Sequence, residues 1–104
     1  MVEKLDLNNL REELDKIDKT IAGQFEARMN VITKIAQYKI ENNLPTYDAS
    51  RESFIIERNK SYVSSKYQQY YGELFGTVLK VSKQYQDNLK EQHKKKEQQQ
   101  ELEK

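Results

Sequence analysis

The stretch LNNLREELDKIDKTIAGQFEARMNVITKIAQYK, from Leu7 to Lys39, decides the fold of this chain. Its apolar residues recur at alternating spacings of three and four, which is typical of a helix that packs one edge against other helices. This apolar seam consists of Leu7, Leu10, Leu14, Ile17, Ile21, Val31 and Ile35. Gln24 and Arg28 interrupt the seam, and a charged residue there is costly unless it is paired. The stretch predicts one long helix and makes Arg28 the first candidate functional residue.

The length of this helix favours a dimer. At ~1.5 Å per residue it extends for roughly 50 Å, whereas a compact globule of this chain length has a radius of gyration near ~13 Å. An apolar seam on so long a helix needs an extended bundle or a second subunit to cover it, and symmetric dimers are the commonest such assembly. We therefore expect a homodimer.

Composition narrows the function classes. The 104 residues suit one helical domain, and 18 basic against 17 acidic residues give a net charge of +1, which does not favour nucleic acid or a membrane surface as a partner. The chain has no cysteine and one histidine, His93, which lies in a polar segment, so we expect no metal and no cofactor. There is no apolar N-terminal run, and a cytoplasmic location is expected.

Two further helices are expected after the first. Asn42, Asn43 and Pro45 predict a loop over residues 41–47. Asp48 or Ser50 can then cap a short second helix over about 49–63. A third, medium-long helix starts near residue 66 and carries an apolar seam from Tyr67 to Leu89 with a flank of Phe75, Leu79, Ser82 and Gln86. We expect residues 1–90 to form the helical domain and residues 91–104 to be a polar, charged helix extension or frayed tail.

Several polar side chains on these helices can converge in a bundle. Arg28 and Lys39 share a face of the first helix, because eleven residues make almost a whole number of turns. Asp48, Arg51 and Glu52 share a face at the start of the second helix, and Ser82 and Gln86 are neighbours on the third. Each of these except Arg28 is, taken alone, more often a surface charge, a cap or a helix border. For Arg28, the alternative to a functional role is a buried pair with Glu13, Glu52 or Glu57.

One distance restricts how a shared site can be built. Arg11 and Lys39 would lie roughly 42 Å apart along one helix at about 1.5 Å per residue. That separation is too long for both to contact one small ligand within a single chain. If both serve one site, Arg11 must come from the other chain of a dimer.

The pattern resembles the all-helical chorismate mutases, in their monofunctional bacterial form. The matching pieces are Leu10-Arg11, Ile17-Asp18, Glu26-Ala27-Arg28, Ile35-Ala36-Gln37-Tyr38-Lys39, Leu44-Pro45-Thr46-Tyr47-Asp48-Ala49-Ser50-Arg51-Glu52, Tyr71-Gly72-Glu73-Leu74-Phe75, Ser82 and Gln86. Together they cover about residues 7 to 89. The resemblance implies an intertwined all-α homodimer of three-helix chains. It also implies the Claisen rearrangement of chorismate to prephenate, in phenylalanine and tyrosine biosynthesis, without a metal or cofactor.

The resemblance also implies roles for single residues. Arg28 and the partner subunit's Arg11 would bind the two carboxylates of chorismate, and Arg51 and Ser82 would complete these contacts. Lys39 and Gln86 would donate hydrogen bonds to the ether oxygen, where negative charge grows in the transition state. Glu52, with the backbone near Asp48, would hold the ring hydroxyl.

Two other functions remain open at this point. An isochorismate pyruvate lyase shares the fold and a similar cationic pocket, although the pair of Lys39 and Gln86 favours the mutase. A noncatalytic helical dimerisation module is the alternative from another class. The module predicts that Arg28→Ala is neutral or stabilising for folding, whereas the enzyme predicts a large loss of activity.

Overall fold

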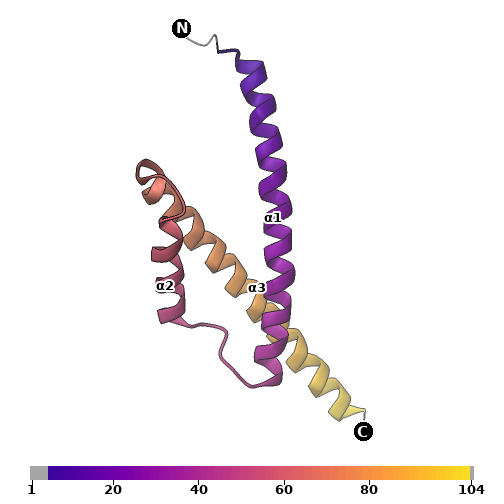
Figure 1. Ribbon diagram of the computed structural model, residues 1–104. Helices are drawn as coiled ribbons and strands as arrows, with labels where there is room; N and C mark the ends of the chain where they lie inside the picture. Colours follow the sequence, from indigo (N-terminus) through magenta and orange to yellow (C-terminus); the bar gives the residue numbers. More distant parts are fainter. Residues whose placement is uncertain (1–4, 104) are drawn as a thin grey trace. The chain divides into compact units, whose positions relative to one another are not determined.

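The computed structural model describes residues 5–103 and is helical throughout its regular elements. The order is α1 (Leu7–Glu41), α2 (Ala49–Lys60), a short 3-10 helix η1 (Ser65–Tyr67) and α3 (Gln68–Leu102), as Figure 1 shows. The prediction of three helices in an all-α chain is confirmed for the described residues. Among them, no helix combines the length and apolar character needed to cross a membrane.

Local chemistry explains where α1 begins and ends. The Asp6 side chain precedes the helix and accepts a hydrogen bond from the Asn8 backbone N–H at 3.0 Å. At the other end, Asn43 has a positive φ of 54°, which asparagine tolerates better than most residues. This turn lets the Leu44 N–H donate to the Lys39 carbonyl at 2.8 Å. Pro45 follows directly and cannot continue a helix.

The second helix is shorter than the sequence predicts. Its start agrees, because Asp48 is the N-cap and its Oδ1 accepts from the Arg51 N–H at 3.0 Å. It ends at Lys60 rather than near Val63. Ser61 causes the early end, since its hydroxyl and its N–H both donate to the Arg58 carbonyl, at 2.6 and 3.2 Å.

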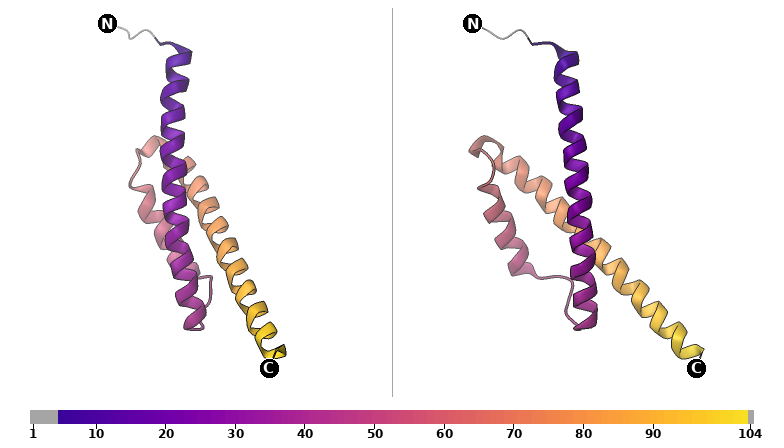
Figure 2. Two further views of the ribbon diagram at one scale, coloured as in Figure 1. Left: turned by 90° about the vertical axis from the view of Figure 1, so that its right-hand side faces the viewer. Right: turned by 45° about the vertical axis from the view of Figure 1, so that its right-hand side comes forward.

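The third helix equals α1 at 35 residues, so the predicted medium-long helix and a helical extension after it form one element. It is one continuous helix, and Figure 2 shows its C-terminal part as a helical ribbon near the end of the chain. Its last turns are rich in Lys, Glu and Gln, which are strong helix formers, and contain no Gly or Pro. The polar segment after residue 90 is therefore helical as far as Leu102, and position 104 of the predicted extension lies outside the described residues.

The chain divides into two units, Met1–Val31 and Ile32–Lys104. The described part of the first unit is the N-terminal part of α1, and its apolar side chains are exposed. Their exposed fractions are 60% for Leu7, 41% for Leu10, 55% for Leu14, 54% for Ile17 and 59% for Ile21. This unit has an apolar stripe that the single chain leaves uncovered.

The second unit has a thin core. Its buried apolar side chains, among the described residues, are Ile32, Ala36 and Leu79. Ser82 and Gln86 are also buried, so the buried line of α3 is the predicted flank. The predicted seam of α3 is half-buried at Tyr71, Val78, Tyr85 and Leu89 in the single chain, whereas Leu74 is 61% exposed and Val81 36% exposed. The buried flank residues lie one position after Val78, Val81 and Tyr85.

Candidate functional site

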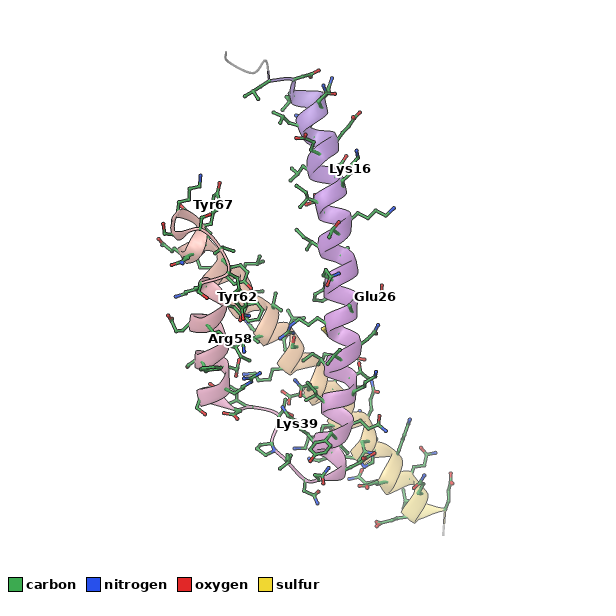
Figure 3. The ribbon with its side chains drawn as sticks, in the orientation of Figure 1. Lys16, Glu26, Lys39, Arg58, Tyr62 and Tyr67 are labelled. Carbon is green, nitrogen blue, oxygen red and sulfur yellow. The ribbon has the colours of Figure 1, made fainter. Side chains whose placement is uncertain are left out.

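The ammonium group of Lys39 joins three segments of the second unit. It donates to Oε1 of Gln86 on α3 at 3.2 Å and to the backbone carbonyl of Thr46 at 2.9 Å. Thr46 belongs to the connection between α1 and α2, and Figure 3 shows Lys39 beside that connection. Lys39 and Gln86, predicted from the sequence as a pair, are thus brought together by the fold.

This contact fixes the orientation of the Gln86 amide. An ammonium group has only donors, so the atom of Gln86 that faces Lys39 must be the carbonyl oxygen. The amide nitrogen Nε2, with two N–H donors, is then directed away from Lys39. Lys39 uses two of its three protons on Thr46 and Gln86, which leaves one for a further acceptor. The pair therefore offers two adjacent sets of N–H donors.

A small crevice adjoins these donors. It is a shallow depression without internal space for a water molecule. Its lining consists of Ala36, Lys39, Ile40, Leu44, Thr46, Gln86 and Lys90. Hydrogen-bond donors beside apolar walls are stronger electrostatically than the same donors in water. The donors of Lys39 and Gln86 beside the crevice are suited to stabilising negative charge on an oxygen atom.

The start of α2 supplies the second group of predicted residues. Asp48 is exposed, and its pKa lies below the usual value of 3.8. The main cause is the hydrogen bond from the Arg51 backbone N–H, followed by that from the Ser50 hydroxyl, and the positive charge of Lys39 adds to them. Asp48 therefore stays ionised and caps α2 within the electrostatic reach of Lys39.

Three further predicted residues, Arg51, Glu52 and Ser82, have different neighbours in the free chain. The Arg51 guanidinium lies 5.9 Å from the ring centroid of Phe54, so it stacks on its own helix. Glu52 is half-buried, and its N–H donates to the Asp48 carbonyl at 3.0 Å. Ser82 is 3% exposed, and its hydroxyl donates to the Val78 carbonyl at 2.8 Å. The Ser82 hydroxyl therefore has a local backbone partner in the free chain.

Arg11 and Arg28 lie on α1 in the first unit, whereas the other six predicted site residues lie in the second. Arg11 is exposed. Arg28 is half-buried and takes part in an interaction. A charged seam residue that is engaged and partly covered agrees with the cost of leaving such a charge unpaired.

Sequence reasoning missed two parts of the crevice. The Thr46 acceptor is a backbone carbonyl, and backbone atoms give no signal in the residue type. Lys90 did have a signal, because it follows Gln86 by four residues and therefore lies on the same face of α3. It was placed at the end of the helical domain and given no role in the site. Lys90 adds a second cation to the lining of the crevice.

Comparison with known proteins identifies the family. The profile of the chorismate mutase type II family matches residues 10–87. A bifunctional chorismate mutase/prephenate dehydratase of Buchnera aphidicola subsp. Schizaphis graminum is 38% identical over 58 residues, which cover 56% of this chain and 15% of that protein. Its counterpart from subsp. Acyrthosiphon pisum is 35% identical over 75 residues, which cover 69% of this chain and 19% of that protein.

A smaller relative is a 4-amino-4-deoxychorismate mutase of Streptomyces venezuelae, 31% identical over 64 residues, which are 62% of each chain. No solved structure gives a significant match. This chain covers less than a fifth of the length of each bifunctional relative. The family match extends over most of the three helices and includes the segments that carry Lys39 and Gln86. The chain belongs to the chorismate mutase type II family.

Proposed function

We propose that this protein converts chorismate to prephenate by a Claisen rearrangement. The observation that carries the proposal is the pair of Lys39 and Gln86, which presents N–H donors at a crevice in a chain of the chorismate mutase type II family. The reaction is intramolecular, since one carbon–oxygen bond breaks as one carbon–carbon bond forms. It needs no nucleophile and no proton transfer, so donors and positioning are sufficient.

The two donors act mainly in the transition state. Negative charge grows on the ether oxygen as its bond to the ring breaks, and the free proton of Lys39 and Nε2 of Gln86 would both donate to it. Such donors stabilise the transition state more than the substrate, which raises kcat rather than merely tightening binding. Removing one donor of this kind typically costs 10²–10³ in kcat, about 2.7–4 kcal/mol.

The remaining predicted residues would hold the substrate. Arg28 and the partner subunit's Arg11 would bind the two carboxylates, because a planar guanidinium matches a carboxylate with two parallel hydrogen bonds. Arg51 and Ser82 would complete these contacts. To do so, Arg51 must turn from the Phe54 ring and the Ser82 hydroxyl must leave the Val78 carbonyl.

Glu52 and the backbone near Asp48 would receive the ring hydroxyl. The cap geometry supports this role, because Asp48 fixes the first turn of α2 and thereby the position of Glu52. Holding the enolpyruvyl group over the ring in a chair-like pose would lower the barrier further by orientation.

The working form would be an intertwined homodimer in the cytoplasm. Its support is the uncovered apolar stripe of the first unit, since stripes of this kind mark protein interfaces. A second copy would cover the stripe and bring Arg11 to the other chain's site. Residues 1–90 would form the catalytic domain and 91–104 the polar helix extension.

The Streptomyces relative favours a second candidate substrate, 4-amino-4-deoxychorismate, in which an amino group replaces the ring hydroxyl. Glu52 is the residue that would distinguish the two, because a carboxylate pairs more strongly with an ammonium than with a hydroxyl. Relative kcat/KM on the two substrates decides which one the site prefers.

The test is to incubate the purified protein separately with chorismate, 4-amino-4-deoxychorismate and isochorismate and to identify the products. Lys39→Ala is the diagnostic variant, and Lys34→Ala is its control, since Lys34 is an exposed lysine of the same helix. We expect prephenate from chorismate with the wild type and Lys34→Ala, and almost none with Lys39→Ala. Pyruvate from isochorismate alone would indicate the lyase. If a folded dimer turns over none of these substrates, the result would support the noncatalytic dimerisation module.

A further inference from the structure

The connection between α1 and α2 is attached to α3 by a second contact beside the Lys39 network. The ammonium of Lys83 lies 4.5 Å from the ring centroid of Tyr47. This distance is within the range of a cation–π interaction, and Lys83 is half-buried. Tyr47 directly follows Thr46, whose carbonyl accepts from Lys39. The contact therefore fixes the residue next to a hydrogen-bond partner of Lys39.

The connection is also held near its two ends. The Leu44 N–H donates to Lys39 at one end, and the Asp48 side chain caps α2 at the other. Between them, the Lys39 and Lys83 contacts attach the connection to α1 and α3. Both lysines lie on helices of the same unit.

We propose that Lys83 and Tyr47 form a positioning clamp, which holds the Thr46 carbonyl so that it orients the Lys39 ammonium toward Gln86. This inference rests on the proposed function, because it assigns the clamp to the residue that would contact the ether oxygen. Lys83 and Tyr47 are positioning residues and act through Lys39.

The physical reason lies in the lysine side chain. Lys39 carries a compact charge on a flexible four-carbon stem, so its ammonium can adopt many positions unless acceptors hold it. Thr46 and Gln86 are those acceptors. When the clamp is lost, the Thr46 carbonyl moves with the connection and the ammonium is aligned for a smaller fraction of the time. An exposed cation–π contact corresponds to roughly a two- to fivefold change in an equilibrium.

The kinetic experiment is a double-substitution cycle of Tyr47→Leu and Lys83→Met. Each single variant is expected to lower kcat by about two- to fivefold with little change in KM, and the double variant to be no slower than the slower single. Tyr47→Phe and Lys83→Arg keep a ring and a cation, and they should restore kcat. The matched control is Lys66→Met, which removes a lysine lying 5.0 Å from the Tyr67 ring, away from the Lys39 contacts. It should leave kcat unchanged.

A second readout does not depend on turnover. In protein labelled with ¹⁵N-lysine, the Lys39 ammonium signal is assigned by its loss in Lys39→Arg. The protons of this ammonium group should exchange slowly with water because two acceptors hold them. Lys83→Met should accelerate this exchange, and Lys66→Met should not. If no chorismate is consumed, the proposed function fails, while the exchange rates still test the clamp.

The clamp is overturned if Lys83→Met and Tyr47→Leu leave both kcat and the Lys39 exchange rate unchanged. It is also overturned if their effects on kcat multiply in the double variant, or if the conservative variants are as slow as the disruptive ones. A lower thermal midpoint with unchanged kcat and exchange would show a purely structural contact and would likewise reject the proposal.

Discussion

Gln86→Glu is the substitution that most sharply separates the proposed role of the amide from a structural one. In the wild type, Gln86 Oε1 accepts from Lys39 at 3.2 Å, and Nε2 remains a donor at any pH. The new carboxyl group is nearly the same size and can still accept from Lys39. It can donate to the substrate only when it is protonated. The substitution therefore makes the rate depend on pH without altering the shape of the site.

The size of the effect follows from the protonated fraction. An ordinary glutamate has a pKa of about 4.3, so at pH 7.5 roughly one molecule in 10³ is protonated. The expected kcat at pH 7.5 is therefore about 10³ lower than that of the wild type. If Lys39 alone still donates to the ether oxygen, the loss is limited to the 10²–10³ that removing one donor typically costs.

The assay follows chorismate consumption from pH 5 to 8, with circular dichroism confirming the fold at each pH. The wild type should show no acid optimum, and Gln86→Glu should gain rate as the pH falls, by as much as tenfold per unit. Gln86→Ala is the control and should be slow at every pH. The reasoning is refuted if Gln86→Glu is within tenfold of the wild type at pH 7.5, if it gains nothing on acidification, or if the wild type loses activity sharply above pH 5.

Three further predictions address the cap, the dimer and the shared site. The lowered pKa of Asp48 means that its charge stabilises the fold above the usual pKa of 3.8 and that this stabilisation is lost as the pH falls through the lower folded value. Asparagine at position 48 still caps a helix but has no charge to lose, so in Asp48→Asn the thermal unfolding midpoint should fall less below pH 4 than in the wild type. The same fall of the midpoint in both proteins would contradict this. Ile17→Glu places a charge in the uncovered stripe, where an apolar side chain contributes about 1.5–3 kcal/mol when buried, so sedimentation should show monomers at concentrations where the wild type is dimeric. Arg11→Ala and Arg28→Ala should each be inactive, but mixing and refolding them together should restore roughly a quarter of the wild-type activity, because half of the dimers would then contain one intact site. If the mixture stays inactive, Arg11 does not act across the interface.

The helix pattern was predictable because it depends on local chemistry. The three-four spacing gave α1, the Asn-Asn and Pro signals gave the connection, and Asp48 gave the cap. The early end of α2 was missed because a serine that bonds back to its own helix looks like any other polar residue. Whether the polar end of α3 is helical or frayed was left open, because it has strong helix formers without an apolar face to pack, and it is helical to Leu102.

The candidate site was predictable in part. The resemblance to the all-helical chorismate mutases assigned Lys39 and Gln86 to one site, and the structure joins them. The Thr46 carbonyl was not predictable, because an acceptor from the backbone depends on the path of the connection rather than on a residue type. The contact of Lys83 with Tyr47 was also missed, since it depends on how that same connection lies against α3.

The most direct test of the account is the steady-state rate of prephenate formation from chorismate by the wild type and by Lys39→Ala under the same conditions. The account places Lys39 at the ether oxygen, so the substitution should lower kcat by about 10²–10³ and change KM far less. Unchanged kcat with a raised KM would show that Lys39 only binds the substrate, and unchanged values of both would remove Lys39 from the site.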